Sequence, residues 1–259
     1  MMNTKLLKDI VGIYKVVGFY LLMKWTFYLF INVFKILQQK NLEPADKAMG
    51  NGPIKVRFNN KTALLSGLQV FSGIREIWVR DCYLSTYLNF NDDKLVVDLG
   101  ANIGVFTQLA LSQNSELEII SVEPNYRLLR DLENSVKNNG WNDRVRTIRS
   151  FLGTKTDIQK QAINNESYRD VKFISEDEFI KRFSIQKIDF LKIDIEGSEF
   201  SFINQNSKLL LISKKIAIEI HENGGDVQAF INYLQFNNFT VHSIKWARGG
   251  CVLLATRNI

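Results

Sequence analysis

The chain has 259 residues, of which 46% are apolar, so it can bury one large core and fold as one main domain. Its two cysteines, Cys82 and Cys251, lie far apart, which excludes a disulfide framework and a cysteine-rich zinc site and favours a reducing compartment, the cytoplasm. The formal net charge of +6 comes mostly from scattered lysines, and no basic block indicates a nucleic-acid-binding patch.

The first predicted element is a hydrophobic helix over Val16–Phe34, a stretch whose one charged residue is Lys24. A narrow polar stripe recurs at helical spacing through Lys24, Tyr28, Asn32 and Lys35, which favours a helix that lies on a membrane surface. Two alternatives stay open: the helix spans a membrane, or it packs on its own domain or on a sister subunit. A linker over Asn41–Pro53 follows.

The sequence therefore predicts two parts, with the helix and linker in residues 1–50 and the main domain in residues 51–259. The main domain begins with an antiparallel hairpin, in which Ile54–Phe58 and Thr62–Leu65 flank a turn at Asn59 and Asn60.

From Lys94 onward, short apolar runs alternate with helical segments, as is typical of a mostly parallel sheet covered on both faces. The last two strands are joined only by KWARGG, too short for a helical crossover, so one strand must run antiparallel near the edge of the sheet. The predicted strands are Leu95–Asp98, Glu118–Glu123, Val145–Ser150, Ile188–Asp194, Ile216–His221, Thr240–Ile244 and Cys251–Thr256. The predicted helices are Val105–Ser112, Tyr126–Asn138, Glu176–Phe183, Phe202–Ile212 and Val227–Asn237.

The turn after the first of these strands reads KLVVDLGANIGVFT and lies where open parallel sheets bind ligands. Its spacing is D-x-G-x-x-x-G, which differs from the G-x-G-x-x-G of dinucleotide sites, and Asp98 favours an ammonium over a phosphate. Glu123 ends the next strand, where a carboxylate can accept hydrogen bonds from a ribose diol. Together these features favour an adenosyl ligand with an amino-acid tail, although Glu123 could instead cap the helix that begins near Asn125.

Five motifs then resemble the FkbM family of S-adenosylmethionine-dependent methyltransferases: VVDLGANIGVFT, SVEPN, NNGWNDRV, IDFLKIDIEGSEF and IAIEIH. The resemblance covers roughly residues 76–256 and is most specific at KIDIEGSE. It implies the class I methyltransferase fold, a Rossmann-like α/β fold with a seven-stranded sheet, and S-adenosyl-L-methionine as the cofactor. The positions that match the family and are implied to bind the cofactor are Asp98, Gly100, Asn102, Gly104 and Glu123.

The resemblance also implies methyl transfer to oxygen, and a hydroxyl acceptor must lose its proton to a base. Asp194 ends its strand next to the expected reactive end of the cofactor, and is predicted both to bind the cofactor and to take part in catalysis. Glu196 follows two residues later, and His221 ends the neighbouring strand. His221 is the first choice as base because its ordinary pKa lies near neutrality. Structural roles for all three residues stay open, and no ligand spacing demands a metal.

The favoured function is an S-adenosylmethionine-dependent O-methyltransferase that acts on a hydroxyl of a glycan, a glycolipid or a related natural product. Two alternatives stay open: an RNA methyltransferase, and a non-catalytic binding protein with the same fold. The expected partners are a small-molecule or glycan substrate and, through the N-terminal helix, a membrane surface. A nucleic acid is not expected, because no basic stripe with interleaved aromatic residues occurs.

Overall fold

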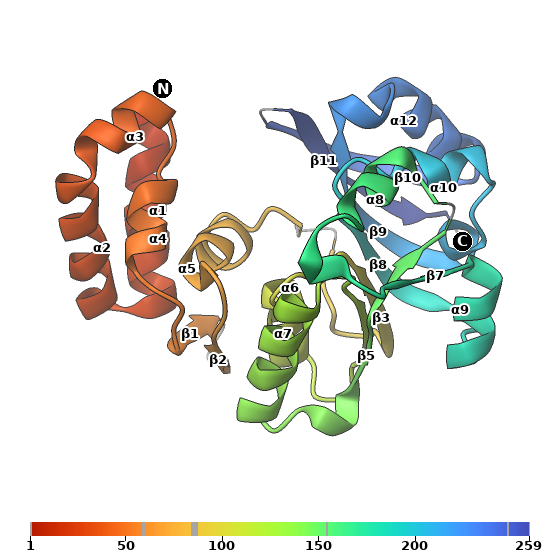
Figure 1. The fold of residues 1–259 in the computed structure, drawn as a ribbon, viewed down its shortest axis with the longest axis horizontal. Helices are drawn as coiled ribbons and strands as arrows, with labels where there is room; N and C mark the ends of the chain where they lie inside the picture. Colours follow the sequence, from red (N-terminus) through yellow and green to blue (C-terminus); the bar gives the residue numbers. More distant parts are fainter. Residues whose placement is uncertain (1, 59–60, 84–87, 154, 248, 259) are drawn as a thin grey trace.

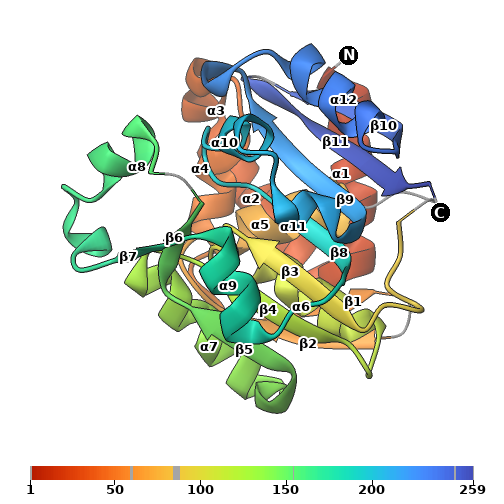
Figure 2. The ribbon, with the colours of Figure 1, turned by 90° about the vertical axis from the view of Figure 1, so that its right-hand side faces the viewer.

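The computed structural model describes residues 2–58, 61–83, 88–153, 155–247 and 249–258. Its centre is a seven-stranded sheet with the order β10-β11-β9-β8-β3-β4-β5 (Figures 1 and 2). All neighbouring strands pair parallel except β11, which runs antiparallel to both β9 and β10. This confirms the predicted mostly parallel sheet with one reversed strand near its edge. The strands are β3 (Leu95–Leu99), β4 (Glu118–Val122), β5 (Val145–Ile148), β8 (Ile188–Ile193), β9 (Ser213–His221), β10 (Phe239–Ala247) and β11 (Gly250–Arg257).

The sheet separates two hydrophobic cores, because successive strand side chains point to opposite faces. Val96 and Phe190 belong to one core, whereas Val97 and Leu191, one position further along, belong to the other. Burial on both faces explains why these strands are continuous apolar runs in the sequence. The first core also contains residues of α6 (Val105–Gln113). The second contains residues of α9 (Glu176–Phe183), α10 (Phe200–Asn204), α11 (Lys208–Leu211) and α12 (Val227–Phe236).

Two predicted elements are divided in the structure. The strand expected over Val145–Ser150 ends at Ile148, and β6 (Ser150–Leu152) pairs instead with β7 (Lys172–Ile174) in a separate sheet. The helix expected over Phe202–Ile212 breaks into α10 and α11, since the Ser207 hydroxyl accepts the Leu210 N–H and starts a new helix. The remaining helices of this region are α7 (Tyr126–Asn138) and the short α8 (Asp157–Ala162).

The single hydrophobic helix predicted near the N-terminus is wrong: the segment folds as α1 (Met2–Val17), α2 (Phe19–Ile31) and α3 (Val33–Gln39). Gly18 separates α1 from α2 with φ of 86°, a left-handed conformation that glycine adopts readily. The chain bends by 74° between α2 and α3. Within the described residues, no single helix has the length and apolarity to cross a membrane; α2 and α3 meet those criteria only as a bent pair.

The predicted linker over Asn41–Pro53 contains α4 (Glu43–Ala48), which packs against α2. Asp46 on α4 is fully buried, accepts a hydrogen bond from the Trp25 indole at 2.8 Å and pairs with the Arg75 guanidinium. Trp25 lies in the same core as Phe106 of the main sheet. The segment is therefore part of a packed N-terminal layer, and the division of the chain at residue 50 stays a prediction.

The hairpin is confirmed by β1 (Ile54–Phe58) and β2 (Lys61–Leu65), which pair antiparallel. The turn predicted at Asn59 and Asn60 lies outside the described residues. Two short helical segments, α5 (Val70–Gly73) and η1 (Ile74–Val79), follow the hairpin and contact one another. They lie between the N-terminal layer and the sheet (Figure 1).

Candidate active site

The carboxyl ends of four neighbouring strands bring most of the predicted site residues to one edge of the sheet. Gly100 and Asn102 follow β3, Glu123 follows β4, Asp194 follows β8, and His221 ends β9. Two cavities meet at this edge. Both are lined by Gly100, Asn102, Leu128, Asp194 and Glu196.

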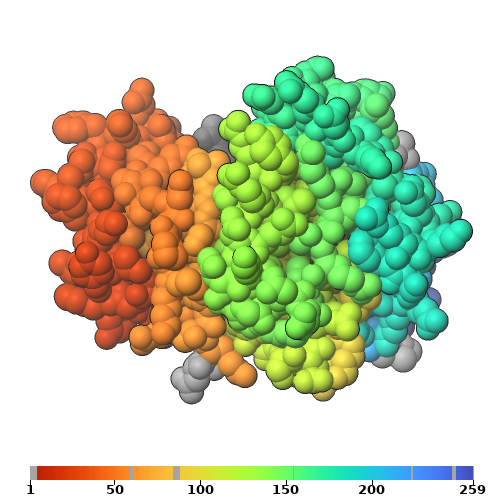
Figure 3. Space-filling model, turned by 60° about the horizontal axis from the view of Figure 1, so that its bottom comes forward, coloured from red at the N-terminus to blue at the C-terminus, as the bar shows by residue number. Residues whose placement is uncertain are grey.

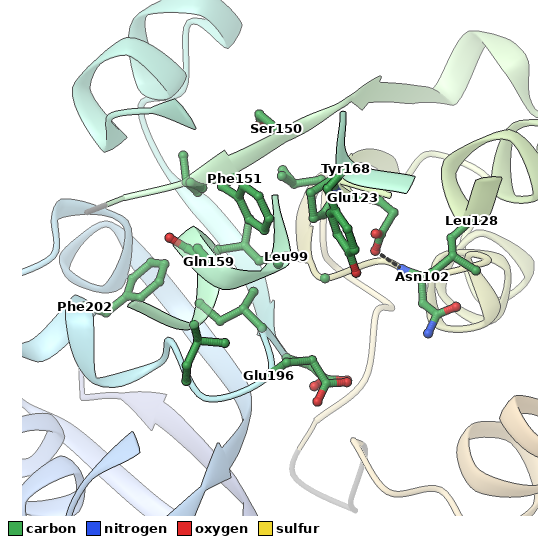
Figure 4. Close-up of a pocket in the computed structure, with 18 residues that line it drawn as sticks. Leu99, Asn102, Glu123, Leu128, Ser150, Phe151, Gln159, Tyr168, Glu196 and Phe202 are labelled. Carbon is green, nitrogen blue, oxygen red and sulfur yellow. Dashed lines mark hydrogen bonds between the residues drawn. The ribbon is translucent and has the colours of Figure 1, made fainter. Parts of the chain in front are cut away.

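The first, which we call the aromatic cavity, has Phe151 and Tyr168 in its wall (Figure 4). Their rings stack with a centroid distance of 5.7 Å and an interplanar angle of 12°. Glu123 also lines this cavity, beside Tyr168, and its two carboxylate oxygens accept the N–H groups of Asn102 and Asn125, each at 2.8 Å. Burial raises the pKa of Glu123 to about 7.

Gly100 brings the backbones after β3 and β8 into direct contact. Its φ is 75°, and a Cβ atom at this position would lie 1.6 Å from the carbonyl oxygen of Asp194. Any side chain here would therefore push apart the two segments that form the floor shared by the cavities.

Asp98 and Gly104 support this turn from beneath and line neither cavity, so their predicted contact with the cofactor stays a prediction. Asp98 is fully buried and accepts the Thr107 hydroxyl at 2.7 Å. Gly104 allows close helix packing, because a Cβ atom there would lie 2.6 Å from the Leu132 side chain. The ammonium expected beside Asp98 is supplied by the chain itself, as Lys192 Nζ lies 3.3 Å from Asp98 Oδ1.

Lys192 is a buried cation at the centre of the site. Its Nζ donates to the carbonyl oxygen of Gly100 at 2.8 Å and lies 3.6 Å from Asp194 Oδ2. Burial alone would lower the pKa of Lys192, but the nearby Asp98 and Asp194 outweigh burial and raise it above its usual range. Lys192 therefore stays charged and fixes the glycine turn to the end of β8.

The second cavity, which we call the acidic cavity, lies on the other side of the shared floor, towards α5 and η1. Carboxylates outnumber basic side chains among the described residues that line it. The carboxylates are Glu76, Asp194, Glu196 and Glu219, and the basic side chains are Lys192 and His221.

Tyr83 bridges two of these carboxylates, since its hydroxyl lies 2.9 Å from Asp194 Oδ2 and 2.8 Å from Glu219 Oε2. A phenol has one hydrogen and donates it to one acceptor, so two hydrogen bonds require a proton on one of the carboxylates. Burial, together with the charge of Asp194, raises the pKa of Glu219 to about 7. The raised pKa makes Glu219 able to hold this proton nearer to neutral pH than an ordinary glutamate can.

His221 lines the acidic cavity and is oriented by Glu199, a fully buried carboxylate. The Nδ1 atom of His221 lies 3.1 Å from Glu199 Oε1, which also accepts the N–H groups of Ile195 and Gly197. The hydrogen bond with Glu199 and the negative charges nearby raise the pKa of His221 to about 9. The imidazole is therefore held in a fixed orientation and is a stronger base than an ordinary histidine.

Glu196 lies at the cavity mouth, with its side chain 85% exposed and its Oε2 atom 3.6 Å from His221 Nε2. Its catalytic role stays a prediction. No three His, Cys, Asp or Glu side chains within the described ranges are grouped as metal ligands would be.

The sequence analysis did not single out several residues that the structure places in or behind the cavity walls. Lys192 had a signal, because it is a lysine inside the mostly apolar run IDFLKI. Glu199 and Glu219 occur in the quoted motifs, but their partners, His221 and Tyr83, lie far from them in sequence. The aromatic pair Phe151 and Tyr168 had no sequence signal that distinguishes it from ordinary core residues.

The aromatic cavity fits the adenosyl cofactor that the sequence predicts. Phe151 and Leu152 offer apolar surface for a purine, and each Glu123 oxygen can accept a further hydrogen bond, as from a ribose hydroxyl. The contact at Gly100 keeps the floor free of side chains, so backbone can approach a ligand closely.

Comparisons with known proteins identify the family of the chain. The family model described as the methyltransferase FkbM domain matches residues 98–241, more than half of the chain. No curated protein sequence matches the chain significantly.

Solved structures with similar folds include magnesium protoporphyrin IX methyltransferase from Synechocystis with bound SAM. The two sequences are 10% identical, and the match covers 66% of this chain and 72% of that chain with a TM-score of 0.45. TYW2 of M. jannaschii in complex with AdoMet has 15% identity, with coverages of 78% and 83% and a TM-score of 0.42. TrmK of M. capricolum in complex with S-adenosyl-homocysteine has 14% identity, with coverages of 68% and 69% and a TM-score of 0.43. From the family match, the chain belongs to the FkbM methyltransferases and is an S-adenosylmethionine-dependent enzyme with the class I methyltransferase fold.

Proposed function

We propose that this methyltransferase transfers a methyl group to a hydroxyl oxygen of a glycan, a glycolipid or a related natural product. The observation that carries the proposal is the acidic cavity, where four carboxylates face two basic side chains. Carboxylates accept hydrogen bonds from hydroxyl groups, so this lining suits a neutral acceptor with several hydroxyls.

The same lining argues against RNA as the acceptor. Proteins bind nucleic acids largely through lysine and arginine contacts with phosphates. Of the two basic side chains in the acidic cavity, Lys192 is already paired with Asp98 and Asp194. A phosphate that entered the cavity would meet net negative charge, which repels it.

In this proposal, Asp194 orients the acceptor and His221 accepts its proton. When bound, S-adenosylmethionine would supply a methyl group attached to a positively charged sulfur. The sulfur is an excellent leaving group because it becomes a neutral thioether when the methyl group departs. Asp194 lines both cavities and orients the acceptor hydroxyl beside the cofactor site. The hydroxyl proton passes to Nε2 of His221, the ring nitrogen that faces away from Glu199, and Glu199 stabilises the resulting imidazolium.

The test uses S-adenosylmethionine labelled on its methyl group, incubated with the protein and with separate glycan, lipid and RNA fractions from cells. We expect the label in the glycan or glycolipid fraction, in a form that survives mild base, as a methyl ether does and a methyl ester does not. Label in RNA, or label released by mild base, would contradict the proposal.

The two histidines of the chain provide a matched pair of variants. His221→Ala should bind the cofactor as the wild type does, while turnover falls by about 10²- to 10⁴-fold, the usual contribution of a general base. His242 lies on the edge strand β10 and bonds to Thr256, away from both cavities. His242→Ala should therefore leave turnover unchanged, and an equal effect of the two changes would discard His221 as the base.

A further inference from the structure

The helices α2 and α3 expose a large apolar surface, which we call the outer apolar face. Single exposed apolar residues are common on soluble proteins, but a contiguous group of this size marks an interaction site. The most exposed members are Phe34 at 83%, Phe30 at 79% and Tyr20 at 78%. The face consists of Phe19, Tyr20, Met23, Phe27, Phe30 and Ile31 on α2, and of Phe34 and Leu37 on α3.

This face is not a core surface that the chain has left unpacked, because α2 packs through its other side. Leu22 and Trp25 are the buried residues of α2, and helical geometry directs them away from the stripe formed by Phe19, Met23, Phe27 and Phe30. The N-terminal helices form one end of the molecule, and α2 is the outermost helix there (Figures 1 and 3). The outer apolar face is therefore available to a partner.

The exposed charged residues that precede Glu43 in the sequence all have one sign. Five lysines among the described residues up to residue 40 are exposed, and Lys24 is half-buried beside the Tyr28 ring. Asp9, the one acidic residue before Glu43 in the sequence, is buried and paired with Arg75 and Arg80. The exposed lysines are Lys5, Lys8, Lys15, Lys35 and Lys40.

We propose that the outer apolar face binds the surface of an anionic lipid bilayer, with α2 and α3 lying along the interface. An interfacial helix combines an apolar face with lysines that attract anionic lipids. The 74° bend between α2 and α3, both of them short, suits helices that rest on a bilayer rather than one that crosses it. A second copy of the chain is a poorer partner, since it would bring lysines close to lysines.

The inference goes beyond the methyl-transfer reaction and is tested without it. The full chain is sedimented with vesicles of phosphatidylcholine alone, and with vesicles that also contain phosphatidylglycerol. We expect strong binding only to the vesicles with phosphatidylglycerol, and a marked loss of binding as salt is added.

Paired variants locate the binding surface. Phe27→Glu combined with Phe30→Glu should reduce binding about tenfold or more, because both side chains lie in the outer apolar face. Phe236 on α12 is 86% exposed but lies outside the face, so Phe236→Glu is the matched control and should bind like the wild type. Circular dichroism and thermal melting verify that each variant folds, and Phe30→Ser provides a milder second variant.

Three outcomes would overturn the proposal. The first is an absence of binding to the anionic vesicles. The second is binding that Phe27→Glu with Phe30→Glu leaves unchanged, or that is equally strong without phosphatidylglycerol. The third is a stable dimer in light scattering that the same double change dissociates, which would assign the face to a second copy. None of these results bears on methyl transfer, which is measured separately.

Discussion

His221 has two properties that bear directly on catalysis: it lines the acidic cavity, and the buried Glu199 fixes the orientation of its ring. The same contact that orients the ring raises its pKa to about 9. At pH 7 only about one molecule in a hundred then has the neutral imidazole that can accept a proton. As the proposed base, His221 would thus be strong but seldom available at neutral pH.

This predicts the pH dependence of turnover. If His221 is the base, kcat should rise about tenfold per pH unit from neutrality and level off near pH 9, where the imidazole has lost its proton. Glu199→Gln removes the charge that stabilises the imidazolium, so it should lower both the pH of the plateau and kcat. The measurement is kcat against pH at saturating cofactor and acceptor.

A plateau that begins near pH 7 would contradict His221 as the base. It would favour Glu219, whose pKa lies near 7 and which shares a proton with Tyr83 and Asp194. Glu219→Gln would then remove the titration, whereas with His221 as the base it should leave the position of the plateau near pH 9.

The sequence predicted correctly which residues near the carboxyl ends of strands line the cavities. Gly100, Asn102, Glu123, Asp194 and His221 all follow or end a strand, and all line a cavity. The sequence pattern does not distinguish residues that line a cavity from residues that support the same turn, such as Asp98 and Gly104. Nor could it identify Tyr83 or Phe151, because their roles depend on contacts with residues distant in the chain.

At the level of single elements, β3 and β8 are joined by a buried ion pair between Lys192 and Asp98, in addition to their backbone pairing. Both side chains are buried, and removal of one partner leaves an uncompensated charge in the interior. Lys192→Met should therefore lower the free energy of unfolding by about 3–5 kcal/mol. The double change Lys192→Met with Asp98→Asn should recover much of that loss, because it also removes the buried negative charge. The measurement is denaturant-induced unfolding of the cofactor-free protein.

If Lys192→Met proved as stable as the wild type, the pair would not be a structural contact. Equal losses for the single and double changes would show instead that packing, and not the uncompensated charge, decides the effect.

Regular elements with strong periodicity were predicted to the residue, as α7 and α9 show. Breaks inside apolar segments were missed. The predicted helix over Val16–Phe34 continues across Gly18 and Asn32, where the structure ends α1 and α2, and the predicted strand continues past Ile148, where β5 ends. Local periodicity therefore identifies elements well but does not locate bends that tertiary packing imposes.

At the scale of the whole molecule, buried polar contacts connect the N-terminal layer to the rest of the chain. Asp46 on α4 contacts Trp25 of α2 and Arg75 of η1, and Arg75 also contacts Asp9 of α1. These residues are up to 66 positions apart in sequence, so no local pattern could reveal their pairing. The sequence consequently suggested a helix and a linker where the structure has a packed layer.

This network predicts that the layer and the sheet unfold together. Asp46→Ala should destabilise the protein by about 3–5 kcal/mol, because it leaves the buried Arg75 without its main partner. Asp46→Asn keeps an acceptor for the Trp25 indole and should cost less. Tryptophan fluorescence and far-ultraviolet circular dichroism should follow one transition; two separate transitions would mean that the layer is an independent unit.

The central claim is that the aromatic cavity, which Glu123 lines, holds S-adenosylmethionine, and calorimetric titration with this cofactor tests it most directly. The wild type should bind at a single site, and Glu123→Ala should weaken binding about tenfold or more, since a carboxylate that accepts diol hydrogen bonds is lost. Binding by Glu123→Ala that equals the wild type, or no binding by the wild type, would contradict the account.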